Sequence, residues 1–335
     1  MINYLFIFFF INLFIYIFRN KIIEIYNLYD VPDNKRKLHP NKTSIVGGLF
    51  FFINILFYFI TIFLNKDFID FSILFISDLN LLYFILIIVS FFIFGYFDDK
   101  FNINANLKLL ILVSLIFLIL KNDDNLLIPY LNFSFSDKII FLDKLSFIFT
   151  IFCFISFINA FNLFDGINCQ IGLYVLFILI LILSLNSELL LFSSLLFPLI
   201  IFLILNYQGK IFIGNAGSYL LGFILSYIII KFYNNTNSLY ADKILLIMFL
   251  PGIDMIRLFF IRIKNKKNPF SPDRNHLHHK LLKKFGYTYT IQTVVGLSIL
   301  PYTIAIFLSS YISLVIFIIV YFALNKFLSL EKRFK

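Results

Sequence analysis

The stretch NAFNLFDGIN, from Asn159 to Asn168, decides how the rest of this chain is interpreted. An apolar run from Leu145 to Phe157 leads into it, and another from Ile171 to Leu185 follows it. Amide and carboxylate side chains at the end of a membrane span are costly unless they face water, a partner or a ligand. A polar turn between two spans is the simpler alternative, but such a turn needs only a Gly and one Asn. The stretch therefore predicts a functional site at the end of a membrane span.

The composition of the chain excludes a soluble globular domain. Hydrophobic residues make up 61% and charged residues 14%, with a mean hydropathy of +0.94, whereas soluble domains carry about 25% charged residues. The two cysteines, Cys153 and Cys169, match no metal or disulfide spacing. The first apolar run ends before Arg19 without a small-residue cleavage site, so we expect it to be a membrane anchor.

Apolar runs long enough to cross a hydrocarbon core of about 30 Å recur along the whole chain. They predict an all-α, polytopic integral membrane protein with about eleven transmembrane helices. Because no soluble domain or linker separates them, we treat residues 1–335 as a single membrane-embedded domain. The runs lie near residues 2–18, 44–64, 80–97, 106–120, 145–161, 170–186, 189–206, 211–232, 242–261, 291–308 and 311–326.

The distribution of Lys and Arg predicts the orientation. If loop 19–43 lies in the cytoplasm, most of the 28 Lys and Arg residues fall on cytoplasmic segments, as the positive-inside rule requires. The N-terminus is then outside and the C-terminus cytoplasmic. Every patterned polar cluster lies on the cytoplasmic side, whereas a transport path would place polar groups at mid-depth. This favours an enzyme over a transporter, and its active site is expected in segments 19–43, 98–108, 159–169, 207–218 and 254–290.

Segment 98–108 carries both anionic and cationic side chains. Asp98 and Asp99 end a span, and adjacent carboxylates usually bind a cation or share a proton, although a solvated helix end is the alternative. Lys108 follows, where its ammonium could meet a phosphate or extend to the membrane surface.

The central stretch and the segment near residue 214 predict a metal and phosphate site. Asn159, Asn162 and Asp165 are spaced to share one helix face, and their oxygens suit Mg²⁺. The small residues of GNAGS, Gly214 to Ser218, open a helix whose N–H groups a phosphate could approach.

The last segment, SPDRNHLHHKLL, follows a span that contains Asp254 and Arg257. Its H-x-H-H spacing lacks the second ligand pair of a structural zinc site. Cationic groups of this kind suit a diphosphate better. Its polar residues are Asp273, Arg274, His276, His278 and His279.

Together these residues resemble the polyprenyl-phosphate N-acetylhexosamine-1-phosphate transferases, over a region from about Asp33 to Leu282. The H-x-H-H segment is similar to the branch that uses N-acetylglucosamine, and not to the peptidoglycan branch. The motifs that carry the resemblance are RKLH…GG (Arg36 to Gly48), DD (Asp98 and Asp99), NxxNxxDGxN (Asn159 to Asn168), GNxGS (Gly214 to Ser218) and DRNHLHH (Asp273 to His279).

The resemblance implies a Mg²⁺-dependent glycosyl-1-phosphate transferase, with Mn²⁺ as the alternative ion. The phosphate of undecaprenyl phosphate would attack the β-phosphate of a UDP-N-acetylhexosamine and release UMP, as the first step of cell-surface polysaccharide assembly. The expected location is the bacterial inner membrane, with the site facing the cytoplasm, no nucleic acid partner, and a homodimer left open. The implied residues are Asp98, Asp99, Asp165 and His278 for catalysis, Lys108, Asn168, Arg274, His276 and His279 for substrate, and Asn162 and Asn215 for the metal.

The chain departs from the family pattern at three places. Asn168 stands where part of the family has Asp, although other members also have Asn. Asn215 stands where many members have Asp, which removes a charge from the implied metal site. Lys42, Ser44 and Ile45 stand where a PTPR-like run is common. The alternatives are a lipid or nucleotide-sugar transporter and an inactive regulatory relative.

Overall fold

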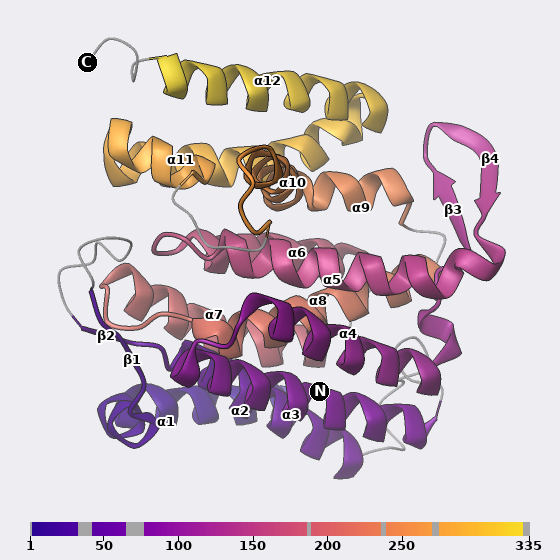
Figure 1. Cartoon of the computed structure of the whole chain (residues 1–335). Helices are drawn as coiled ribbons and strands as arrows, with labels where there is room; N and C mark the ends of the chain where they lie inside the picture. Colours follow the sequence, from indigo (N-terminus) through magenta and orange to yellow (C-terminus); the bar gives the residue numbers. More distant parts are fainter. Residues whose placement is uncertain are drawn as a thin grey trace. The chain divides into compact units, whose positions relative to one another are not determined.

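The computed structural model describes residues 2–32, 42–64, 77–185, 189–235, 239–269 and 275–330, and it is almost entirely helical (Figure 1). The chain forms two compact units. The first unit contains residues Met1–Leu126 and Ile151–Lys231, and the second contains Leu127–Thr150 and Phe232–Lys335. Helices α5 and α8 contribute to both units, because each continues across a boundary.

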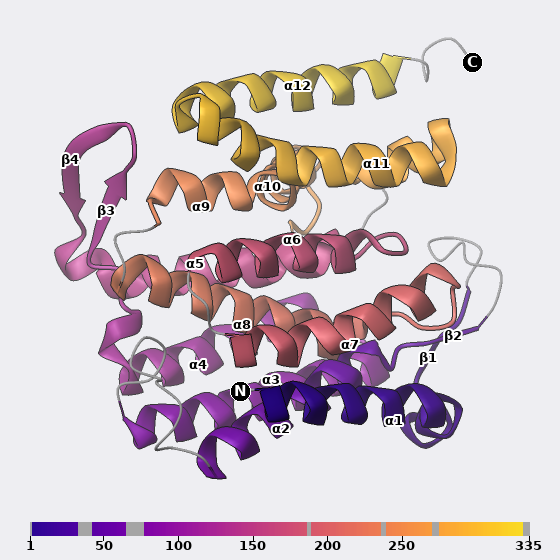
Figure 2. The ribbon, with the colours of Figure 1, turned by 180° about the vertical axis from the view of Figure 1, so that it is seen from behind.

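Helix α7 organises much of the first unit, where it packs against α1, α2 and α6. Figure 2 shows α1, α2 and α7 running side by side. The short pair β1 and β2 is antiparallel. The elements are α1 (Ile2–Tyr26), β1 (Tyr29–Asp30), β2 (Thr43–Ser44), α2 (Gly47–Leu64), α3 (Asp78–Phe101), α4 (Ala105–Asn122), η2 (Asp124–Leu126), α5 (Ser146–Phe164), α6 (Gln170–Leu185), α7 (Leu189–Tyr207) and α8 (Gly214–Asn235).

Glycines let the beginning of α8 approach two other helices at backbone distance. A Cβ on Gly48 would lie 2.4 Å from the backbone nitrogen of Gly217, and a Cβ on Gly95 would lie 2.3 Å from Cα of Ala216. The N–H of Gly48 also donates to the carbonyl of Ile213 at 2.9 Å. Small residues at helix contacts allow this approach in membrane proteins. The glycines therefore fix the beginning of α8 against α2 and α3, close to the polar residues Asp99 and Asn215.

Aromatic side chains fill the interior around α8. The stretch of α8 that is apolar and long enough to cross a membrane is buried along its whole length. Phe223 of α8 stacks on Phe91 of α3 with ring centroids 4.6 Å apart, and Tyr227 lies 4.2 Å from Phe84. Offset and tilted ring pairs of this kind are favourable beyond their contact area. The many phenylalanines of the sequence thus form a packed core and do not only face lipid.

The second unit contains the C-terminal helices and a hairpin. Helices α11 and α12 pack against each other and against α9, and Figures 1 and 2 both show α11 beside α12. The hairpin lies between α4 and α5, where the sequence predicted no strands, and Asp242 holds its turn by accepting from the backbone N–H of Ser134 at 2.8 Å. The elements are β3 (Tyr130–Phe133), β4 (Ser136–Phe141), η3 (Asp143–Leu145), α9 (Ala241–Ile247), α10 (Phe249–Lys264), α11 (Leu277–Phe307) and α12 (Ser310–Leu330).

The helices confirm a multi-pass membrane protein. Within the described residues, seven helices are long and apolar enough to cross a membrane, or eight if α9 and α10 form one span. Three further apolar stretches are shorter: Gly47–Phe63 of α2, Gln170–Leu185 of α6 and Ser194–Tyr207 of α7. Every predicted apolar run coincides with a helix, but the run at 242–261 is not one straight helix. It bends by 78° between α9 and α10. In a continuous helix the ring of Pro251 would clash with the carbonyl of Ile247, the last residue of α9, so the helix breaks there.

Candidate functional site

Asp98 lies in the last turn of α3, at the end that the sequence predicts to face the cytoplasm. It is fully buried. Its Oδ2 accepts from the ammonium of Lys108 at 2.8 Å and from the hydroxyl of Tyr219 at 3.1 Å. Its Oδ1 accepts from the backbone N–H of Ile103 at 3.0 Å. Lys108 is about a quarter exposed, with a relative side-chain area of 28%. Asp98 therefore faces inward and holds Lys108, whose ammonium has further donors that can reach a ligand.

Asp99 points in a different direction and caps helix α8. Its two carboxylate oxygens accept from the backbone N–H groups of Asn215 at 2.8 Å and Ala216 at 3.1 Å. A carboxylate is stabilising at this end of a helix because the first N–H groups have no partner within the helix and the dipole is positive there. The hypothesis that these N–H groups bind a phosphate is therefore wrong for Asn215 and Ala216, since Asp99 occupies both.

The predicted metal residues Asn162 and Asn215 lie side by side. Nδ2 of Asn162, near the end of α5, donates to Oδ1 of Asn215 at 3.0 Å and to Oγ of Ser218 at 2.6 Å. Because the amide nitrogen of Asn162 faces α8, its oxygen is on the opposite side of the amide group. The backbone of Asn215 is in turn held by Asp99. One set of contacts thus joins three of the predicted site residues.

Asp165 follows the end of α5 and does not share its helical face. The helix ends at Phe164, so the expectation that Asn159, Asn162 and Asp165 lie along one helix face is wrong for Asp165. The side chain of Asp165 is exposed. The negative charges of Asp99 and Asp30 act on its carboxyl group and raise its pKa. A carboxylate with anionic neighbours is a good position for a cation.

The loop that contains Asn168 is anchored to the segment before α8. Asn206 accepts from the backbone N–H of Cys169 at 2.6 Å and donates to the carbonyl of Ile211 at 2.7 Å. Asn168 also lies near Gly209, since a Cβ on that glycine would be 4.0 Å from Nδ2 of Asn168. The α5–α6 loop is therefore placed beside the α7–α8 loop by side chain to backbone bonds.

These residues supply individual oxygen atoms that could ligate a metal ion. They do not form a preformed cluster of His, Cys, Asp or Glu ligands. Within the part of the chain that the structure describes, no three His, Cys, Asp or Glu side chains gather into a group that could hold a metal ion. The amide oxygens of Asn162 and Asn215 and the exposed carboxylate of Asp165 remain. Mg²⁺ accepts such a site, because it prefers a few protein oxygens and keeps waters or substrate phosphates as its other ligands.

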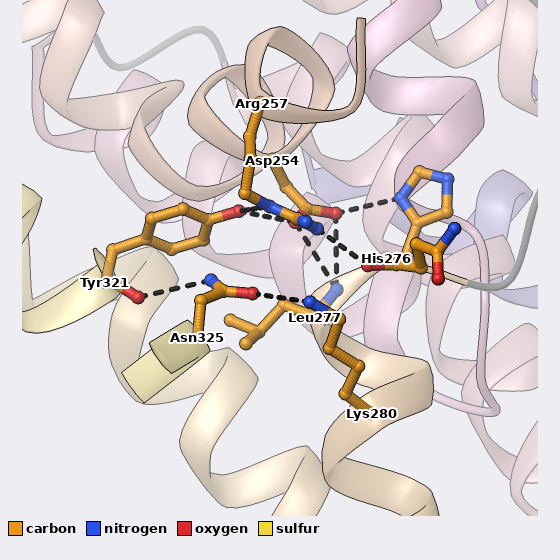
Figure 3. A network of polar contacts seen from close by, with 8 residues as sticks. Asp254, Arg257, His276, Leu277, Lys280, Tyr321 and Asn325 are labelled. Carbon is orange, nitrogen blue, oxygen red and sulfur yellow. Dashed lines mark hydrogen bonds and ion pairs between the residues drawn. The ribbon is translucent and has the colours of Figure 1, made fainter. Parts of the chain in front are cut away.

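The second unit holds a separate network around Asp254, which is buried in α10 (Figure 3). Its Oδ2 lies 2.8 Å from Nδ1 of His276. Its Oδ1 accepts from Nη2 of Arg257 at 2.8 Å and from the hydroxyl of Tyr321 in α12 at 2.6 Å. Figure 3 shows Asp254 between Tyr321 and His276. One carboxylate thus links α10, α12 and the segment that begins α11.

The three histidines of this segment contact one another. The rings of His276 and His278 stack, with centroids 5.3 Å apart and planes 13° from parallel. His279 meets both rings edge-on, at 6.3 Å from His276 and 4.3 Å from His278. His276 and His278 are buried within this structure and His279 is half-buried. The orientation of one ring therefore constrains the other two.

The structure places most of the predicted residues and adds two tyrosines. Arg274, Asp273 and the RKLH part of the first motif lie outside the described residues. Tyr219 and Tyr321 were not predicted. Tyr219 directly follows GNAGS, which could have drawn attention to it, whereas Tyr321 contacts a residue 67 positions away and left no signal in the sequence.

Comparisons with known proteins match the part of the chain that contains the site of the first unit. The model of glycosyl transferase family 4 matches residues 81–233, which contain Asp98, Asp99, Asn162 and Asn215. The chain is 28% identical over 294 residues to the undecaprenyl-phosphate alpha-N-acetylglucosaminyl 1-phosphate transferase of Escherichia coli O157:H7, covering 84% of this chain and 76% of that protein. The proteins of that name from Salmonella typhi (29% identical, 84% and 76% covered) and Thermotoga maritima (28% identical, 81% and 78% covered) are similarly related.

Proposed function

Because the chain belongs to glycosyl transferase family 4, we propose that it transfers a sugar 1-phosphate from a UDP-sugar to undecaprenyl phosphate and releases UMP. An oxygen of the lipid phosphate forms a bond to the β-phosphorus of the UDP-sugar, and the bond from that phosphorus to the oxygen bridging the two phosphates breaks. The sugar is an N-acetylhexosamine in this proposal, in keeping with the N-acetylglucosaminyl transferases that the chain resembles. The product starts the assembly of a cell-surface polysaccharide.

One observation carries this proposal. Residues that are far apart in the family-matched region 81–233 meet around the beginning of α8. Asp99 holds the backbone of Asn215, and Asn215 in turn accepts from Asn162. Phosphoryl transfer depends mainly on positioning and on stabilisation of charge, and needs little covalent chemistry from the protein. A rigid group of polar residues at the end of three membrane helices meets this need.

Lys108 is the cation of this group that reaches outward. Asp98 is buried and has three donors around its carboxylate, so in this arrangement it holds Lys108 in place. The side chain of Lys108 is partly exposed, and in this proposal its ammonium also binds a phosphate oxygen. A phosphate ester of a lipid is already largely ionised at neutral pH, so the reaction does not require Asp98 to remove a proton.

Asn162, Asn215 and Asp165 are the residues that would hold Mg²⁺. When bound, the ion would neutralise charge on the diphosphate of the UDP-sugar. Around it, Asn162 and Asn215 orient each other, and Asp99 fixes the backbone of Asn215. The absence of an Asp at position 215 is compatible with this role, since an amide oxygen also ligates Mg²⁺, with a weaker charge.

The membrane arrangement follows from the same proposal. We propose that the helices form about eleven spans, with the N-terminus outside and the C-terminus in the cytoplasm of a bacterium. The three shorter apolar helices and the bent pair α9 and α10 would then each count as one span. The positive-inside rule supports this orientation. It gives the soluble UDP-sugar access to the site from the cytoplasm and the lipid access from the inner membrane.

Release of UMP tests the function directly. Purified protein is mixed with undecaprenyl phosphate, Mg²⁺ and a panel of UDP-sugars, and UMP is measured with and without lipid and metal. Release that needs both, and that is lost in Lys108→Ala and Asp98→Ala, supports the proposal and identifies the sugar. If folded protein releases no UMP from any UDP-sugar, the transferase proposal is wrong and the inactive or transporting alternatives take its place.

A matched substitution tests the metal residues. If Asn215 contributes a neutral ligand, Asn215→Asp should lower the Mg²⁺ concentration that gives half-maximal UMP release, because it restores a negative charge while keeping an acceptor for Asn162. Asp137→Asn is a control on an exposed strand position. An unchanged or higher Mg²⁺ requirement for Asn215→Asp would contradict the metal role.

A further inference from the structure

The Asp254 network determines the position and the tautomer of His276. An ionised carboxylate only accepts hydrogen bonds. The bond of 2.8 Å between Oδ2 of Asp254 and Nδ1 of His276 therefore requires Nδ1 to carry a proton. The other ring nitrogen, Nε2, is on the far side of the imidazole. A histidine held in this way is pre-oriented to use Nε2 for a ligand.

The same carboxylate also fixes the backbone beside the ring. The N–H of Leu277, the first residue of α11, lies 3.3 and 3.4 Å from the two oxygens of Asp254. Nη2 of Arg257 donates to the carbonyl of Asn275 at 2.7 Å. The residues on both sides of His276 are thus held by the network that holds its ring. Little freedom remains for the side chain to turn away.

Two neighbours keep Asp254 in its own position. Arg257 balances its charge, and the hydroxyl of Tyr321 donates to it while accepting from Nε of Arg257 at 2.7 Å. Asp254, Arg257 and Tyr321 are all shielded from solvent. Breaking one partner of a buried charge pair is costly, so the group behaves as one rigid unit. The arrangement resembles the general case in which an outer carboxylate orients a functional histidine.

We propose that Asp254 is a positioning residue for His276: its carboxylate accepts from Nδ1–H and thereby directs Nε2 to a phosphate group of the substrate, to which Nε2 donates when it also carries a proton. This rests on the proposed function for the identity of the ligand. The orientation of the ring itself does not depend on that function. Because His276 stacks on His278 and meets His279, the position of His276 also sets the other two rings of the cluster.

A double-mutant cycle tests whether Asp254 acts through His276. Asp254→Asn keeps the shape of the side chain and should lower UMP release by about 10- to 100-fold, the usual effect of losing a hydrogen bond to a charged group. In a His276→Ala background the same substitution should have no further effect. Equal fold losses in both backgrounds would show that Asp254 supports only the fold, and would overturn the proposal.

A control variant shows whether any change in this region lowers UMP release, and a second test variant is available if Asp254→Asn does not fold. Asn325→Leu removes the bond of 3.1 Å from Lys280 to Asn325 in the same region without touching Asp254, and should leave UMP release unchanged. If Asp254→Asn fails to fold, Tyr321→Phe takes its place in the cycle. It should lower UMP release when His276 is present and leave it unchanged in the His276→Ala background, and equal losses would again overturn the proposal.

A spectroscopic measurement is independent of the proposed reaction. The chain contains four histidines, so a protein labelled with ¹⁵N-histidine in lipid bilayers gives a simple spectrum in which His276→Gln assigns one signal. We expect His276 to show a protonated Nδ1 in the unmodified protein and to lose that signal in Asp254→Asn. An unprotonated Nδ1, or the same signal in both proteins, would overturn the proposal even if UMP release is normal. The expected signals without any UMP release would leave the positioning intact and refute only the function.

Discussion

Asp99→Ala should lower the thermal stability of the protein, because Asp99 caps helix α8. The substitution removes both acceptors of the N–H groups of Asn215 and Ala216, which lie 2.8 and 3.1 Å from the carboxylate. Loss of a helix N-cap costs about 0.5–2 kcal/mol, and a hydrogen bond to a charged group contributes about 1.5–3 kcal/mol. For two such bonds on a half-buried side chain we expect a loss of about 3 kcal/mol. At about 2–4 °C per kcal/mol for a unit of this size, the unfolding midpoint should fall by about 6–12 °C.

The two cysteines provide the assay. Cys169 is buried and Cys153 is partly buried, so a dye that becomes fluorescent on reaction with thiols reports unfolding in detergent. Asp137→Ala is the matched control, because this carboxylate is exposed on β4, and its midpoint should stay within about 1 °C of the unmodified protein. If Asp99→Ala also keeps its midpoint but loses UMP release, the reasoning is refuted, and Asp99 acts on the substrate and not on the helix.

Three further substitutions test contacts in the first unit. Tyr219→Phe removes only the hydroxyl that donates to Asp98, and should lower UMP release by about 10-fold with little change in the unfolding midpoint; an unchanged rate would contradict the positioning of Asp98 by this tyrosine. Lys231→Met leaves buried Asp123 without its ammonium partner and should cost about 3–5 kcal/mol, measured by thermal unfolding, while adding Asp123→Asn should recover part of the loss. Gly48→Ala places a Cβ 2.4 Å from a backbone nitrogen of α8, so we expect little folded protein on size-exclusion chromatography, and a monodisperse product of normal stability would show that the helices are not in close contact.

Much of the fold could be predicted because apolar length is a local property. Each predicted run of apolar residues coincides with a helix, and only the run at 242–261 needed correction for the bend before Pro251. The hairpin of β3 and β4 was missed, because its exposed residues show no regular alternation and its turn is held by Asp242 from a distant helix. The number of spans and their orientation stay predictions.

The sequence by itself determined which segments carry the polar chemistry, because polar residues in an apolar chain are visible without knowing the fold. It predicted Asp98, Asn162 and Asn215 as members of one site, and in the structure Asn162 and Asn215 are in contact. Their chemical roles stay proposals. The motifs could not show how these side chains point.

Only the tertiary structure decided which partners neighbouring residues contact. Asp98 and Asp99 are adjacent in sequence, yet one holds Lys108 and the other caps α8, because successive residues on a helix point about 100° apart toward different helices. In the same way, Asp254 meets Tyr321 only because α10 and α12 contribute to one buried network. Contacts between distant segments depend on helix packing, and a single sequence carries no local signal for them.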